Sequence, residues 1–124
     1  NIGQMDEIIK NKPEGFDVIS GDDGITFPLI TLGAVGVISV LGNAFPAEFS
    51  KMNRLALEGN YAEALTIHHQ FTEIINLLFA DGNPAGAKAM LNIMGMCENK
   101  LRLPLVPARE ATCDKLRAAW EALK

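Results

Sequence analysis

The apolar residues at the start of the chain follow the spacing of an amphipathic helix. Ile8 and Ile9 come three and four residues after Met5, so the three side chains share one helical face. The polar residues and proline that follow indicate a helix over residues 5–12. No start signal precedes it, because the chain opens at Asn1, and we therefore expect this helix to belong to a longer unit.

Two short apolar runs follow, and each has the features of a buried strand. Residues 16–20 and 36–40 are rich in β-branched side chains and are bounded by glycine. The stretch between them, residues 25–32, fits a helix that Gly33 should end. A strand, a helix and a second strand in this order predict an α/β fold, with parallel strands joined by a crossover helix.

From residue 44 onward the strand signal is lost and apolar residues recur at helical spacing. We expect a helix over 46–58 that Gly59 should end, a long helix over about 61–79 with two apolar faces, a helix from 84 to Gly95, and a final helix that carries Trp120. The long helix should be buried between other helices, because apolar residues occupy two of its faces.

Polar residues stand where these helices should begin. They indicate N-terminal caps, formed by Asp22 and Asp23 before the second helix, with Thr26 as an alternative, by Asn60 with Glu63 as a capping box, and by Asn83 with Pro84 at the first helical position. Residues 101–107 are punctuated by proline and read as a linker.

Two strands alone do not make a stable sheet, because both edges stay unpaired and both faces need cover. A parallel strand pair that leads into helices is what the last two strands of a (β/α)8 TIM barrel would look like. We therefore predict a partial barrel over residues 1–58, made of the end of helix 6, strand 7, helix 7, strand 8 and helix 8. An all-helical C-terminal segment should follow over residues 59–124.

Charge and hydropathy exclude several classes of protein. The net charge is −4, and the 11 basic residues are scattered, which argues against nucleic acid as a partner. The longest apolar stretch, residues 25–41, is interrupted by Pro28 and is too short to cross a membrane. Without a signal-peptide pattern, a cytoplasmic protein is expected. Cys97 and Cys113 lack the spacing of a metal or redox motif and should be reduced packing residues.

Two pairs of polar residues could carry chemistry. Asp22 and Asp23 could form a paired-carboxylate acid/base site, as in a hydrolase, but a role as helix caps is favoured. His68 and His69 are adjacent on a helix and point about 100° apart, so this pair alone does not chelate one metal ion. Core packing or surface exposure is the simpler interpretation.

The remaining composition indicates no cofactor. The series of Gly33, Gly36 and Gly42 lacks the spacing of a dinucleotide-binding loop. The methionines near the C-terminal end are most simply core residues, and these are Met90, Met94 and Met96.

Several short motifs occur together in a characteristic order. They are Ser20-Gly21-Asp22-Asp23, the run Leu-Gly-Ala-Val-Gly-Val-Ile-Ser-Val over 32–40, Gly42-Asn43, Asn83-Pro84 with Lys88, and Leu-Arg-Leu-Pro-Leu-Val-Pro over 101–107. In order and spacing they resemble the dihydrodipicolinate synthase family of pyruvate-dependent aldolases, which includes N-acetylneuraminate lyase. The resemblance covers essentially the whole chain, and its helical part is closest to the synthase branch.

The resemblance implies that the catalytic groups lie outside this chain. In the family a Schiff-base lysine stands in a Lys-Glu-Ala-(Ser/Thr)-Gly-(Asn/Asp) stretch, and Asn1 matches its last position. The lysine and the relay tyrosine would then lie upstream of residue 1, and the chain alone should be inactive. No other lysine fits a barrel strand, since all fall on expected helices or linkers, namely Lys10, Lys12, Lys51, Lys88, Lys100, Lys115 and Lys124.

The resemblance also implies the substrates. Relatives condense pyruvate, held as a lysine imine, with aspartate semialdehyde on the route to diaminopimelate and lysine. By resemblance Ile38 lies beside the pyruvate carboxylate and imine, and the backbone of Gly21 faces the second substrate. From the residues alone, Ile38 reads as a core strand residue and Gly21 as a glycine that permits a sharp turn.

Two other functions stay open. The chain could be part of a sister aldolase acting on neuraminate or a keto-deoxy sugar acid, or a half-barrel that binds a partner without catalysis. Exposed strand edges predict self-association, so a homo-oligomer is expected in either case.

Overall fold

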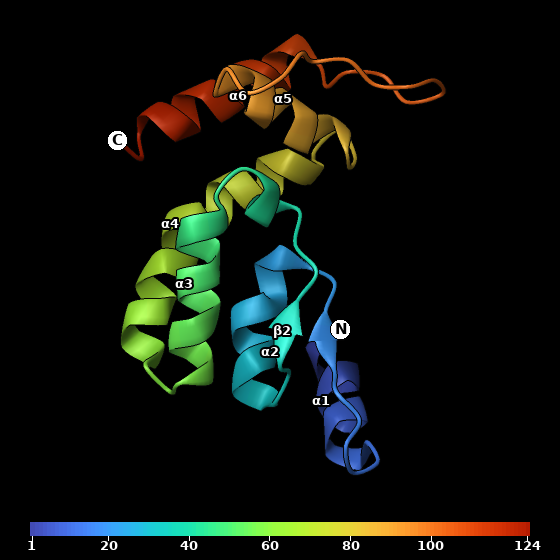
Figure 1. Ribbon diagram of the computed structural model, residues 1–124, viewed down its shortest axis with the longest axis vertical. Coiled ribbons are helices and arrows are strands. Elements are labelled where there is room, and N and C mark those ends of the chain that lie inside the picture. Colours follow the sequence, from blue (N-terminus) through green and yellow to red (C-terminus); the bar gives the residue numbers. More distant parts are fainter.

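The computed structural model describes residues 1–124 and contains six α-helices, two 3₁₀ helices and two short strands (Figure 1). The elements run in the order α1 Ile2–Asn11, β1 Ile19–Ser20, η1 Asp23–Ile25, α2 Thr26–Leu32, β2 Gly36–Val37, η2 Leu41–Asn43, α3 Pro46–Leu57, α4 Tyr61–Phe79, α5 Ala85–Ile93 and α6 Glu110–Glu121. All the predicted elements are present. None of the helices combines the length and the apolar character needed to cross a membrane.

The two strands pair in parallel, as predicted. Ile19 lies opposite Gly36 and Ser20 opposite Val37. Two further bonds extend the pairing, since the amide of residue 35 donates to the carbonyl of residue 18, and Ile38 N donates to Ser20 O, both over 2.9 Å. The strands are shorter than the runs 16–20 and 36–40, because strand structure requires ladder bonds and each strand has only one neighbour.

The first helix begins earlier than expected. It starts at Ile2, and the side-chain oxygen of Asn1 accepts a hydrogen bond from Gln4 N over 3.3 Å. Asparagine is among the favoured N-terminal caps. The expectation that no start signal precedes this helix is therefore wrong, because Asn1 is itself the cap.

The ends of the later helices confirm some local signals and correct others. Gly33 ends α2 and Gly59 follows α3, with φ angles of 113° and 83° that favour glycine. Asn60 makes no capping bond to α4, and its amide nitrogen instead lies 3.5 Å from the Glu58 carboxylate, so the capping box is not formed. Pro84 occupies the cap position of α5, one residue before the place predicted.

Helices α3 and α4 lie side by side and antiparallel, and α5 and α6 pack at the C-terminal end of α4 (Figure 1). The main core of 18 buried residues runs from α2 to α6 and includes Leu41, Met52, Leu78 and Leu116. A second, small cluster of three buried residues joins α1 to α2. The main core is continuous across residue 58, where we expect the division between barrel and helical segment. That division stays a prediction.

Burial departs from the sequence pattern at several positions. The two runs predicted as buried strands are only partly buried, because Phe16, Ile19 and Ile38 are 59%, 52% and 78% exposed. One apolar face of α4 is buried as predicted, but on the other face Leu65 and Phe79 are 38% and 40% exposed. Met90 is fully buried, whereas Met96 is 66% exposed and is not a core residue. These side chains would need neighbours beyond those that this chain provides. Cys97 and Cys113 are not joined by a disulfide.

An ion pair fixes the start of α6 to the end of α4. The carboxylate of Asp81 accepts hydrogen bonds from Arg109 N over 2.8 Å and from Arg109 Nε over 2.6 Å. The side chain of Asp81 is only 11% exposed, while that of Arg109 is 76% exposed. These bonds, first that from the Arg109 side chain, lower the pKa of Asp81 to about 2.

This contact predicts a loss of stability in acid. Because the folded-state pKa of Asp81 is below its usual 3.8, the carboxylate stabilises the fold above about pH 4 and loses this contribution as pH falls towards 2. Asp81→Asn should lower the thermal midpoint at pH 6, and the difference from the unmodified chain should shrink towards pH 2. The matched control is Asp114→Asn on α6, an exposed carboxylate without a hydrogen bond, which should have little effect. An Asp81→Asn difference that stays constant with pH would contradict the assignment.

Candidate functional site

The carboxyl ends of the two strands lie at the same edge, because the strands are parallel. Gly21 follows β1 and Ile38 follows β2, and both line one open cavity of about 500 Å³. The two predicted site residues are therefore brought together, although 17 positions separate them in the sequence. The cavity has further walls from other elements, formed by Ser39, Val40, Asn43, Phe79, Asn83, Pro84, Ala87, Lys88 and Leu91.

Ile38 faces the cavity and has little packing of its own. Its side chain is 78% exposed, so in this chain it is not a core strand residue. Its backbone is well held, because Ile38 N donates to the Ser20 carbonyl oxygen over 2.9 Å. The orientation of this side chain therefore depends on the backbone and not on contacts of the side chain itself.

Gly21 is exposed, and the fold of this chain does not require glycine at this position. Its φ angle is outside the left-handed region, and a Cβ atom here would meet no atom within 4 Å. The interpretation of Gly21 as a glycine needed for a strained turn is not supported by this geometry. The space beside its backbone is open to an approaching group.

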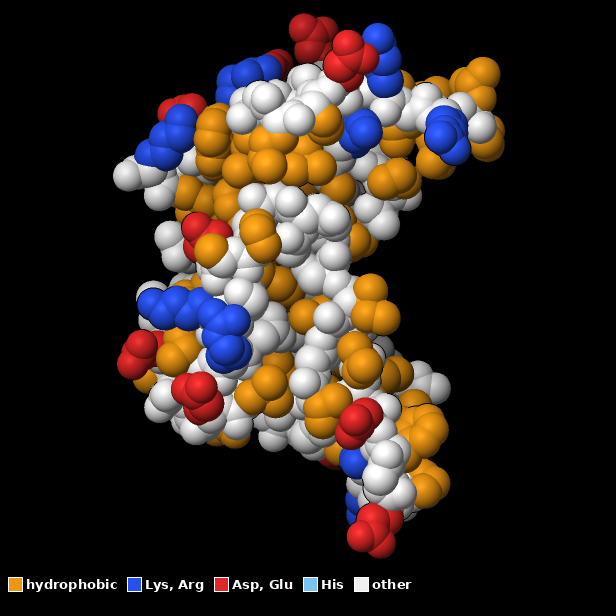
Figure 2. Space-filling model, in the orientation of Figure 1, with side chains coloured by type: hydrophobic (Ala, Val, Ile, Leu, Met, Phe, Trp, Pro, Cys, Tyr) orange, Lys and Arg blue, Asp and Glu red, His pale blue; other side chains and the backbone are white.

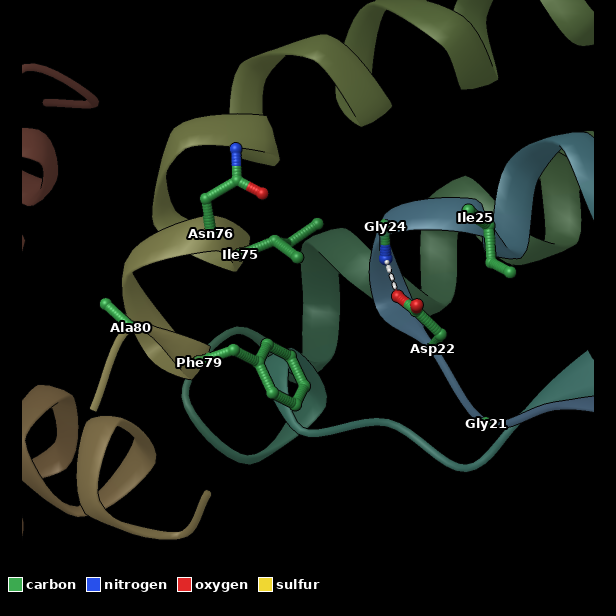
Figure 3. A pocket seen from close by; sticks show the side chains of 8 residues that line it. All are labelled: Gly21, Asp22, Gly24, Ile25, Ile75, Asn76, Phe79 and Ala80. Carbon is green, nitrogen blue, oxygen red and sulfur yellow. Dashed lines mark hydrogen bonds between the residues drawn. The ribbon is translucent and has the colours of Figure 1, made fainter. Parts of the chain in front are cut away.

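A compact network of polar groups fixes the turn that carries Gly21. The hydroxyl of Ser20, which is 2% exposed, donates to Asp22 O over 3.0 Å and accepts from Asp22 N over 3.2 Å. The Thr26 hydroxyl, fully buried, lies 2.8 Å from Asp22 O. The carboxylate of Asp22 accepts from Gly24 N over 2.8 Å, which confirms its predicted capping role (Figure 3).

Asp23 acts differently from its neighbour. Its side chain is 1% exposed, and its Oδ2 accepts hydrogen bonds from the backbone amides of Val40 and Leu41, each over 2.9 Å. It does not cap the helix that follows it, so that prediction is wrong for Asp23. The two aspartates bind separate backbone groups, which does not favour a paired acid/base site.

A second hollow of about 630 Å³ adjoins the first, between the turn at Gly21 and helix α4. Figure 3 shows the side chains of Ile75 and Phe79 directed from α4 towards the turn that carries Asp22. Gly21 and Phe79 line both hollows. The turn after β1 is therefore accessible from two sides.

One positively charged side chain lies on the cavity wall. Lys88 of α5 is the only charged residue that lines it. The same lysine lines a further hollow together with Lys100 and Arg102, although Lys100 is paired with Glu98 over 2.7 Å. This arrangement suits a small anionic molecule, but the cavity wall contains no cysteine, histidine, tyrosine or carboxylate to carry catalysis.

The sequence pattern missed part of this cavity. Val40 and Phe79 gave no functional signal, since each reads as an ordinary apolar residue of a strand or helix. Asn83 and Lys88 were noticed only as motif positions without a role. Their places on the cavity wall follow from the packing of α5 against the end of α4.

His68 is explained by packing. Its ring lies 5.6 Å from that of Phe27 and 5.7 Å from that of His69, measured between centroids. Burial, and then the charge of His69, lower the pKa of His68. The contact with α2 supports the packing interpretation over a metal site.

Comparison with known proteins places these features in a family. The sequence model of the "Dihydrodipicolinate synthetase family" matches residues 1–123. The chain belongs to this family. It is 75% identical over 124 residues to the 4-hydroxy-tetrahydrodipicolinate synthase of Phocaeicola vulgatus, covering 100% of this chain and 42% of that protein.

Solved structures of the same family agree with the fold. A crystal structure of dihydrodipicolinate synthase from Aquifex aeolicus superposes with a TM-score of 0.93 at 39% identity, covering 98% of this chain and 42% of that one. The chloride-inhibited enzyme from Acinetobacter baumannii, complexed with pyruvate, gives a TM-score of 0.94 at 31% identity, covering 99% and 42%. The chain thus spans about two fifths of the length of the relatives it matches.

Proposed function

We propose that this chain forms the last two strands and the helical C-terminal segment of a 4-hydroxy-tetrahydrodipicolinate synthase. Such an enzyme would be a lyase that condenses pyruvate with aspartate semialdehyde in the biosynthesis of diaminopimelate and lysine. The names of the relatives support this activity, and the high TM-scores support the partial (β/α)8 barrel. In this proposal residues 1–58 belong to the barrel and residues 59–124 to the helical segment.

One observation carries the proposal. The carboxyl ends of two parallel strands bring Gly21 and Ile38 to the same open cavity. In (β/α)8 barrels the active site lies at this end of the strands. The free outer edges of β1 and β2 are where the neighbouring barrel strands would pair.

The residues of this chain would shape the substrate pocket and not perform the chemistry. Ile38 would lie beside the carboxylate and imine of bound pyruvate, and the backbone of Gly21 would face aspartate semialdehyde. The absence of steric need for glycine at position 21 supports a close approach of substrate there. Lys88 would add positive charge near two anionic substrates.

The reacting amine and the relay tyrosine would come from residues upstream of Asn1. A buried lysine has a lowered pKa, so its neutral amine attacks the ketone carbon of pyruvate and water leaves as the imine forms. Loss of a methyl proton then gives an enamine whose carbon attacks the aldehyde of the second substrate. The imine serves as the electron sink, and the reaction therefore requires no cofactor.

The synthase is favoured over the two other candidates. The relatives compared above carry the synthase name and not that of a sister aldolase. A half-barrel without catalysis is less favoured, because the relatives that match nearly the whole chain are named as enzymes. We also propose a cytoplasmic homo-oligomer.

Exposed apolar side chains support a larger assembly. Ile38, Leu103 and Val106 are 78%, 87% and 65% exposed. Figure 2 shows apolar side chains gathered over much of the visible face of the molecule and on the loop between α5 and α6. This loop projects from the body. Surface of this kind is usually covered by other protein.

A chimera tests the proposed function. This chain would replace the matching segment of the Phocaeicola vulgatus enzyme, which is 75% identical over it. Incubated with pyruvate and reduced with borohydride, the chimera should gain one pyruvyl group per chain, found by mass spectrometry on a lysine of the Phocaeicola portion. With aspartate semialdehyde added, it should turn over.

The control for the chimera is this chain by itself under the same conditions. It should gain no pyruvyl group. A stoichiometric adduct on any of its own lysines would contradict the proposal, as would a folded chimera that neither traps pyruvate nor turns over.

A further inference from the structure

The hydrogen bonds of the buried Asp23 carboxylate indicate a role other than helix capping or core packing. It is 1% exposed and lies at the start of η1, immediately after the turn that carries Gly21. Its Oδ2 accepts two backbone hydrogen bonds from the segment after β2, donated by Val40 N and Leu41 N over 2.9 Å each. No lysine, arginine or histidine forms a salt bridge with it.

These hydrogen bonds belong to a set that holds the backbone of residues 38–42, which we call the frame around Ile38. The Ser20 carbonyl accepts from Ile38 N at one end of residues 38–41, and Asp23 accepts at the other end. Ser39 Oγ completes the frame, because it accepts from Gly42 N over 2.7 Å. Every backbone donor of residues 38–42 except that of Ser39 is thereby bonded to a group within the chain.

Such a frame is needed because side-chain packing does not hold Ile38. Its side chain is 78% exposed at the cavity wall. A carboxylate that accepts two amides makes stronger bonds than a neutral acceptor, and burial removes the competition of water. The two hydrogen bonds to Asp23 thus hold the backbone beside Ile38, whose own side chain is exposed, and they add to the anchoring that buried Leu41 gives the same stretch.

We propose that Asp23 is a positioning residue that holds the backbone of residues 38–41, so that Ile38 presents its carbonyl and side chain to bound pyruvate. This role rests on the proposed function, since it concerns the same cavity. Asp23 does not touch the substrate in this scheme. It acts through Val40 and Leu41.

The chimera with the Phocaeicola vulgatus enzyme also tests this role, with two variants at one position. Asp23→Ala removes both accepted bonds and should lower kcat/KM for pyruvate about 100-fold, the effect of a misplacement of about 1 Å. Asp23→Asn keeps an oxygen that accepts both amides and should restore activity to within about 10-fold. The KM for pyruvate should rise, whereas that for aspartate semialdehyde should change little.

A control variant separates positioning from stability. Leu116→Ala on α6 truncates a fully buried side chain far along the chain from residues 38–41. It should destabilise the chimera but leave kcat/KM for pyruvate near its original value at a temperature where every variant is folded. Amide hydrogen exchange should accelerate in residues 38–42 for Asp23→Ala and not for Leu116→Ala.

The outcomes distinguish this role from the proposed function. An inactive unmodified chimera would contradict the function and, with it, the role of Asp23 in pyruvate binding. An active chimera in which Asp23→Ala matches Leu116→Ala in kcat/KM, or leaves exchange in residues 38–42 unchanged, would overturn the role of Asp23 alone.

Discussion

Replacement of Gly86 by alanine is expected to prevent helix α5 from packing on the end of α4. A Cβ atom at Gly86 would lie 2.0 Å from the carbonyl oxygen of Leu78 and 2.6 Å from its carbonyl carbon. These are backbone atoms, which do not move aside as the end of a flexible side chain would. The two helices must therefore separate, and the core around Leu78 opens.

The expected cost of Gly86→Ala is large. Overpacking typically costs about 1–3 kcal/mol, and a clash with backbone should exceed about 3 kcal/mol or prevent folding. Urea unfolding of the variant measures the loss. Gly3→Ala in α1 is the matched control, since its Cβ would lie 3.4 Å from Asn1 Oδ1, an ordinary contact, and it should stabilise the chain by about 0.5–1 kcal/mol. Equal unfolding midpoints for the two variants would refute this account of Gly86.

Truncation of Phe71 should have the second-largest effect. Phe71 of α4 is 2% exposed, and its ring lies 5.0 Å from that of Phe45, between centroids, at an interplanar angle of 57°. Phe45 stands immediately before α3, so this pair joins the region after β2 to the long helix. Phe71→Ala should lower the free energy of unfolding by about 3–5 kcal/mol, because it leaves a cavity in the main core.

Two comparisons make the Phe71 result specific. Phe16→Ala removes a ring that is 59% exposed and should change the free energy of unfolding by less than about 0.5 kcal/mol. A double-mutant cycle with Phe45→Ala should give a coupling of about 0.5–1.5 kcal/mol for the ring pair. Additive losses would show that the two rings do not interact.

Some local signals in the sequence were sufficient, because they depend only on a residue's own backbone or on the pattern of adjacent elements. The helix ends at Gly33 and Gly59 were predicted, because a left-handed backbone angle favours glycine whatever surrounds it. The parallel pairing of the two strands also followed from local pattern, since a helix between two strands favours that direction. The family was recognisable for the same reason, because its motifs are contiguous.

The cavity residues were only partly predictable. Gly21 and Ile38 were named from the resemblance, and the parallel register brings them to one cavity. Phe79 gave no signal, and Val40 was noticed only as the last position of the motif run 32–40, because neither side chain differs along the chain from other apolar residues. Their position depends on how η2 and α4 pack.

Only the tertiary structure decided which groups the polar side chains bind and which apolar side chains are buried. Asp23 was expected to cap its own helix, but it binds amides 17 and 18 residues away. Asn60 had the pattern of a capping box, yet its amide turned to Glu58. Sequence by itself determined the order and approximate extent of the helices and strands, since those depend mainly on neighbours along the chain, although α1 begins earlier and both strands are shorter than predicted. Long-range bonds and burial depend on which elements meet in space, and only the packed chain determines that.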